Sequence, residues 1–193
     1  NLFMKKFLGI LVLGLFLVTP SQADDIRDFQ IEGMSIGDSL LDYFSADKIE
    51  EKKKKGFVYK NKEFYSATFY TTEKFELYDA VQFHLKASDK KYIIYSIAGR
   101  MYFQDRISEC HKKMNEVFSD IKQLFKDAKV IDDDTKNTTS LKGYVSVVKS
   151  IYITTDLGDE IAIQCYDHEP EANIFDGLNL AIDSKEFVDW LYE

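Results

Sequence analysis

The longest amphipathic pattern in the chain covers residues 105–128, in the run DRISECHKKMNEVFSDIKQLFKDA. Its apolar side chains recur at steps of three and four residues, which is the spacing of one face of an α-helix. The members of this stripe are Ile107, Cys110, Met114, Val117, Phe118, Ile121, Leu124, Phe125 and Ala128. No Gly or Pro interrupts the run, and Asp105 or Ser108 can cap its first turn. The pattern predicts one long helix that packs its apolar face against the rest of the protein.

Between residues 57 and 103 the pattern changes to an alternation of period two, which is typical of β-strands. The runs 64–70, 77–85 and 92–103 are rich in aromatic and β-branched residues and are joined by short polar turns. They predict an antiparallel meander, with a bulge at Gly99-Arg100.

A second hairpin is expected after the helix, from residues 144–154 and 159–166, with its turn at Asp156-Leu157-Gly158-Asp159. Residues 178–182 predict a last short strand, and the polar stretch 132–140 predicts a loop. At the other end of the chain, the apolar positions in residues 24–32 are compatible with an edge strand.

Short helices are predicted near both ends of the sheet-forming region. Ser35 or Asp38 can cap a helix over 36–46, which a solvated tail at 50–55 follows. The side chains expected to face inward there are Leu40, Leu41, Phe44 and Ile49. A last helix is expected over 184–192, because Asp183-Ser184-Lys185-Glu186 resembles a capping box.

Strands bracketed by helices, without regular β-α-β alternation, predict an α+β fold. We expect one antiparallel sheet, built from the meander and the hairpin and covered by the long helix. Residues 24–193 contain no linker and are expected to form a single domain. Two subdomains divided near Asp105 are the alternative.

Residues 1–23 have the features of a secretory signal peptide. Lys5 and Lys6 precede an apolar stretch at 7–18, and Ser21-Gln22-Ala23 is a small-residue cleavage signal. We expect cleavage after Ala23, and residues 1–3 are interpreted as an upstream extension. The apolar stretch is shorter than the ~20 residues that span a bilayer, so no membrane anchor is expected after cleavage.

The chain is acidic, with 33 Asp and Glu residues against 25 Lys and Arg residues. Removal of Lys5 and Lys6 with the signal peptide makes the balance more negative still. Such a charge argues against nucleic acid or anionic lipid as the main partner. No cofactor is expected.

Export changes the interpretation of the two cysteines, because paired cysteines in an oxidising compartment usually form a disulfide. We therefore expect a bond between Cys110 and Cys165. A zinc site that adds His111 and His168 is the alternative, but its spacing fits no standard structural site. The acidic run from Asp132 fits neither register of an EF-hand loop, so no metal is expected.

The string Gly37-Asp38-Ser39-Leu40 resembles the first block of the GDSL esterases and lipases. The resemblance implies Ser39 as a nucleophile, which would need a histidine as its base. None of the three histidines follows an aspartate in the family's Asp-x-x-His spacing, and the Gly-x-Asn-Asp block is absent. A serine hydrolase is therefore kept only as the alternative function.

Aromatic residues are abundant, with 15 Phe and 12 Tyr. Tyrosines with an apolar ring and a polar tip suit a recognition surface on the meander. The candidates for this surface are Tyr65, Tyr70, Tyr78, Tyr92 and Tyr95. They favour a non-catalytic binding domain for an unknown protein or small molecule.

The chain as a whole resembles small uncharacterised exported proteins of marine alphaproteobacteria. The resemblance rests on the signal peptide and on the runs IEGMSIGDSLLDYF, CHKKMNEVFSDI and DEIAIQCYDH. This resemblance implies a periplasmic location and a domain with paired cysteines. It implies no activity.

Overall fold

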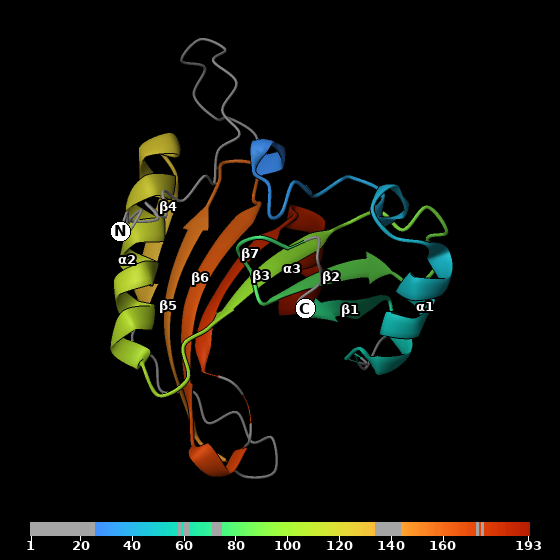
Figure 1. Cartoon of the computed structure of the whole chain (residues 1–193). Helices are drawn as coiled ribbons and strands as arrows, with labels where there is room; N and C mark the ends of the chain where they lie inside the picture. The colour runs from blue at the N-terminus through green and yellow to red at the C-terminus, as the bar shows by residue number, and fades with distance from the viewer. Residues whose placement is uncertain are drawn as a thin grey trace, which may run out of the picture.

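Seven antiparallel strands form one continuous sheet in the order β1-β2-β3-β7-β6-β5-β4 (Figure 1). The strands are β1 (Phe64–Tyr70), β2 (Ala80–Lys86), β3 (Ser96–Tyr102), β4 (Lys129–Asp133), β5 (Ser146–Thr154), β6 (Glu160–His168) and β7 (Gly177–Asp183). The helices are α1 (Ala46–Lys55), α2 (Ile107–Leu124) and α3 (Lys185–Tyr192), with 3₁₀ turns η1 (Ile26–Asp28), η2 (Leu40–Asp42) and η3 (Pro170–Ala172). The α+β class with an antiparallel sheet is therefore confirmed.

The computed structural model describes residues 26–57, 59, 62–70, 75–133, 144–172, 174 and 176–193. The predicted signal peptide at 1–23 lies outside the described residues, and so does most of the predicted loop at 132–140. Within the described ranges, no helix is long and apolar enough to cross a membrane.

Strand β7 lies in the middle of the sheet and joins the meander to the second hairpin. It pairs with β3 on one side and with β6 on the other, so that Ile97, Ile182 and Ile161 are cross-strand neighbours. Strands that precede and follow Asp105 thus belong to one hydrogen-bonded sheet.

The period-two alternation gives the sheet an apolar face, which α2 covers by packing against β6 and β7. The buried side chains of α2 are Cys110, Met114, Val117 and Ile121, all from the predicted stripe. The long helix is thus confirmed, although it is shorter than residues 105–128. Its Phe125 stacks on Phe29 just beyond the last turn.

The opposite face combines small and polar side chains. Ala98, Ala162 and Ala181 pack together at its centre. At one end α3 covers this face, where Phe187 and Trp190 pack on Phe64 of β1. Ser184 caps α3 by accepting a hydrogen bond from the Phe187 N–H, which confirms the C-terminal helix.

A short N-terminal helix is confirmed, but it is α1 over Ala46–Lys55 and not a helix over 36–46. The predicted range contains the short turn η2, and the segment expected as a solvated tail is itself part of α1. The backbone N–H groups of Gly37 and Leu40 donate to the carbonyls of Ile94 and Tyr92, so they are not available to a helix. Leu41, expected to face inward, is 42% exposed.

Three other local predictions also fail. The edge strand expected in residues 24–32 does not form in their described part, which contains the 3₁₀ turn η1 and an isolated bridge between Ile31 and Met34. Gly99 pairs with both neighbouring strands without a bulge. Strand β4 was not predicted. It ends with Asp132 and Asp133, which were assigned to the loop at 132–140.

Candidate functional site: a tyrosine-walled cavity around Arg100

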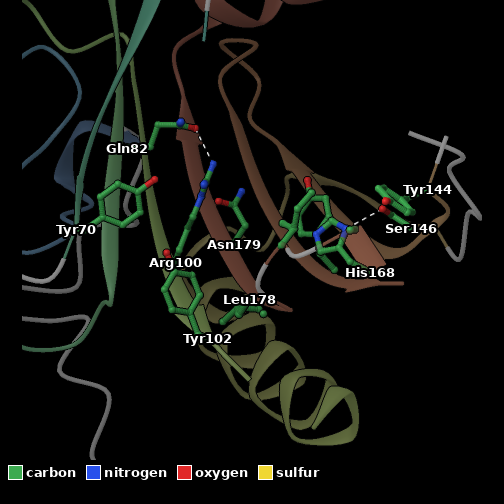
Figure 2. A pocket seen from close by; sticks show the side chains of 13 residues that line it. Tyr70, Gln82, Arg100, Tyr102, Tyr144, Ser146, His168, Leu178 and Asn179 are labelled. Atoms are coloured by element: carbon green, nitrogen blue, oxygen red, sulfur yellow. Dashed lines mark hydrogen bonds between the residues drawn. The ribbon is translucent and has the colours of Figure 1, made fainter. Parts of the chain in front are cut away.

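A cavity of about 590 Å³ opens on the sheet face that carries Arg100, opposite to the apolar face under α2 (Figure 2). Its lining residues come from β1, β2, β3, β5, β6 and β7 and from the segments next to them. They are Tyr70, Gln82, Arg100, Tyr102, Tyr144, Ser146, Tyr166, His168, Ala172, Ile174, Gly177, Leu178 and Asn179.

The sheet register places the polar side chains of this site on one face. Arg100 of β3 lies directly opposite Asn179 of β7, which in turn lies opposite Gln164 of β6. Because side chains alternate along a strand, these three point to the same side as Gln82 of β2. A row of polar groups therefore crosses the centre of the sheet.

Hydrogen bonds organise this row into two groups. Arg100 Nη2 donates to Gln82 Oε1 at 2.9 Å, and Gln82 Nε2 donates to Thr68 Oγ1 at 2.9 Å. In the second group, Gln164 Oε1 accepts from the Tyr166 hydroxyl at 3.0 Å and from Asn179 Nδ2 at 3.4 Å. The Asn179 Oδ1 atom is buried without a hydrogen-bond partner among the described residues.

No described carboxylate forms an ion pair with Arg100. Within the part of the chain that the structure describes, no Asp or Glu lies in ion-pair range of its guanidinium. Among the described residues, no Asp or Glu lines the cavity. A half-buried cation that has no carboxylate partner among the described residues is unusual, since such charges are normally paired.

Four tyrosines, Tyr70, Tyr102, Tyr144 and Tyr166, give the cavity its apolar walls. Burial raises the pKa of Tyr102 and of Tyr166 above the usual value for a phenol. Both therefore keep their protons at neutral pH, and Tyr166 donates its proton to Gln164 Oε1.

A serine and a histidine meet at the far end of the cavity. Ser146 Oγ lies 2.7 Å from His168 Nδ1, and the Tyr166 ring stacks on the His168 ring. Asp176 Oδ1 accepts a hydrogen bond from the backbone N–H of His168 and therefore holds the main chain. In a catalytic triad the carboxylate would bind the imidazole ring.

The five tyrosines predicted as a binding surface do not lie together. Tyr70 lines the cavity and is 59% exposed, whereas Tyr65 and Tyr78 are buried in the core. Tyr92 donates to Glu50 Oε1, and Tyr95 packs on Phe64. Tyr65 and Tyr70 are five residues apart on one strand, and an odd separation places them on opposite faces.

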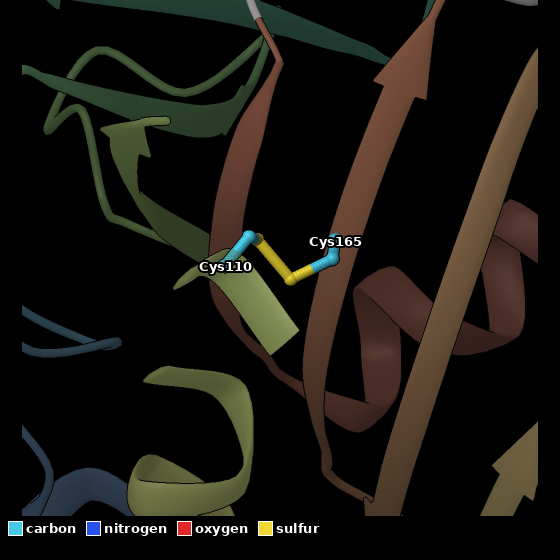
Figure 3. The surroundings of a disulfide bond; sticks show 2 residues. All are labelled: Cys110 and Cys165. Atoms are coloured by element: carbon cyan, nitrogen blue, oxygen red, sulfur yellow. A yellow bond between two sulfur atoms is a disulfide. The ribbon is translucent and has the colours of Figure 1, made fainter. Parts of the chain in front are cut away.

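The two cysteines lie within bonding distance, as predicted. Cys110 of α2 and Cys165 of β6 form a disulfide, with Cα atoms 6.0 Å apart (Figure 3). Their sulfurs are therefore not thiolate ligands for zinc. Among the described residues, no group of three or more His, Cys, Asp or Glu side chains could hold a metal ion.

Ser39, the residue of the GDSL string, takes part in main-chain contacts. Its hydroxyl donates to the Lys91 carbonyl oxygen at 2.7 Å and accepts from the Leu41 N–H at 3.2 Å, which caps η2. Both ring nitrogens of His84 contact other hydroxyls, those of Tyr59 and Ser96.

The polar residues Gln82, Arg100, Gln164 and Asn179 were not singled out from the sequence. Each interrupts an otherwise apolar strand, as Arg100 does in SIAGRMY and Gln164 does in EIAIQCYDH. Polar side chains at equivalent positions of several strands are the signal that could have located the site.

Comparisons with protein-family models, with curated proteins and with solved structures found no match. The geometry of the Arg100 cavity is therefore the basis for a functional interpretation.

Proposed function

We propose that this chain is an exported, non-catalytic periplasmic protein that binds a small organic anion in the Arg100 cavity. The observation that supports this proposal is the guanidinium of Arg100, which faces a cavity that no described Asp or Glu lines. A carboxylate or phosphate of a ligand would supply the missing partner, since guanidinium binds both in a bidentate manner.

The dimensions and walls of the cavity suit the rest of such a ligand. Its volume of about 590 Å³ lies within the range typical of small-molecule sites. The rings of Tyr70, Tyr102 and Tyr166 offer contacts to an apolar or aromatic body, and Asn179 offers a polar group for orientation. We therefore expect an anionic head group on a largely apolar body.

The disulfide supports export, because such bonds persist in oxidising compartments such as the periplasm. The contacts of Ser39 and of the Ser146–His168 pair support a non-catalytic role. Ser39 caps a turn, and the backbone of His168, rather than its ring, bonds to Asp176.

Titration calorimetry with benzoate, phenyl phosphate and neutral benzyl alcohol would test the proposal. We expect the anions to bind to the wild-type protein and the alcohol to bind at least about tenfold more weakly, because charged hydrogen bonds contribute roughly 1.5–3 kcal/mol. The variant Arg100→Gln should lose this preference, whereas Arg100→Lys should keep part of it.

Arg106→Gln is the matched control, since Arg106 is exposed, pairs with Glu109 and lies outside the cavity lining. It should bind the anions as the wild-type protein does. Equal affinity for anions and alcohol, or unchanged anion binding by Arg100→Gln, would refute the proposal.

A further inference from the structure

A second cavity, of about 360 Å³, adjoins the first and shares three lining residues with it, Tyr70, Gln82 and Arg100. Arg100 is thus accessible from two sides. The remaining lining residues come from the end of α1 and from β1, and they are Lys52, Lys55, Gly56, Phe57, Ser66 and Thr68.

The close packing of α1 on β1 brings the two lysines to this cavity. A Cβ at Gly56 would lie 1.8 Å from the backbone oxygen of Ser66, so only glycine permits this approach. The Phe57 N–H then donates to Ser66 Oγ at 2.7 Å. Lys52 and Lys55, in the last turn of α1, are held beside the strand as a result.

The second cavity is also lined by cations, and none of its described lining residues is Asp or Glu. Lys55 pairs with Glu51 at 2.7 Å. Lys52 forms no ion pair with any described residue, and its Nζ lies 5.9 Å from the centre of the Phe69 ring. Within the described ranges, Arg100 and Lys52 are thus two cavity-lining cations that form no ion pair with a carboxylate.

Thr68 adds a neutral donor to the lining of the second cavity. Its Oγ1 accepts a hydrogen bond from Gln82 Nε2, which leaves its own hydroxyl proton available for a ligand. Gln82 in turn accepts from Arg100, so the arginine and the hydroxyl are positioned by the same side chain.

We infer that the head group of the ligand is doubly negative, as in a phosphate monoester, and binds between Arg100, Lys52 and Thr68. The inference rests on the proposed function and specifies its ligand class. A monocarboxylate would balance only one of the two cations, whereas a phosphate monoester carries about −1.5 to −2 charges at pH 7 and has three acceptor oxygens. The apolar body of the ligand then extends into the tyrosine-walled cavity.

Calorimetry at pH 7.5 with phenyl phosphate, benzoate and inorganic phosphate tests the inference. We expect the wild-type protein to bind phenyl phosphate at least about tenfold more tightly than either other probe, since it alone combines the dianion with the ring. Lys52→Gln should reduce this preference over benzoate to less than about threefold and leave benzoate affinity unchanged.

Lys54→Gln is the matched control, because it removes the same charge from the same helix at an exposed position that lines neither cavity. It should retain the preference for phenyl phosphate. Equal binding of benzoate and phenyl phosphate by the wild-type protein would refute the doubly negative head group. It would still agree with the proposed anion site at Arg100. Failure of both probes to bind would overturn the proposed function as well.

Discussion

The ring of Tyr78 occupies the space that the missing side chain of Gly99 leaves on β3. A Cβ added at Gly99 would lie 2.5 Å from the Tyr78 ring atoms, which is closer than van der Waals contact permits. Gly99 is thus required by packing, and it precedes the arginine of the candidate site. The contact explains why a glycine interrupts an apolar strand that has no bulge.

Gly99→Ala is expected to lower the free energy of unfolding by about 1–3 kcal/mol, the usual cost of overpacking a core. Urea denaturation measures this difference. In a Tyr78→Leu background the same substitution should cost less, because the clashing ring is absent. An equal cost in both backgrounds would show that the ring is not the cause.

Reduction of the disulfide is expected to destabilise the protein by about 4 kcal/mol, since the bond closes a loop with a sequence separation of 55 residues. Urea denaturation with and without dithiothreitol tests this value. The double variant Cys110→Ala, Cys165→Ala should be insensitive to the reductant. Alkylation of the native, unreduced protein by iodoacetamide would contradict the existence of the bond.

Asp183 should make stability depend on pH. Burial is the main cause that raises the pKa of its carboxyl group to about 7, with a smaller rise from Glu160 and an opposing hydrogen bond from Ser96. The folded protein therefore binds more protons than the unfolded chain, and this contribution to stability is lost as the pH rises from about 4 to above 7. Asp183→Asn should gain stability relative to the wild-type protein across this window, measured by urea denaturation.

His84 changes the pH dependence of stability in the opposite direction. Its effect must therefore be separated from the effect of Asp183. Burial lowers the pKa of His84 to about 3. The stability that the neutral imidazole contributes is therefore lost as the pH falls below about 6.5. The difference between wild-type protein and Asp183→Asn at each pH isolates Asp183. Asp156→Asn, at an exposed turn position, is the control and should show no such difference. A constant difference between wild type and Asp183→Asn from pH 4 to 8 would refute the assignment.

Ser39→Ala is expected to cost about 1 kcal/mol of stability through the loss of a cap. Thermal unfolding measures this cost, and Ser39→Thr should recover most of it. Hydrolysis of p-nitrophenyl acetate should proceed at the same rate with wild-type protein and Ser39→Ala. An esterase activity that disappears with Ser39→Ala would favour the serine hydrolase instead.

Much of the fold could be predicted because it follows from local patterns. Alternating side chains define β1, β2, β5 and β6, and a stripe of period 3.6 defines α2. The disulfide followed from the positions of Cys110 on the helix stripe and Cys165 on an alternating strand, together with the expected export. These features depend on residues close in sequence, or on a pair that has no competing partner.

The order of the strands and the site were decided by tertiary structure alone. Nothing local to residues 177–183 indicates that β7 inserts between β3 and β6, because strand pairing depends on contacts far apart in sequence. That insertion brings Arg100, Asn179 and Gln164 side by side. The alternation along each strand could be determined from the sequence, but which polar residues meet depends on the register between strands.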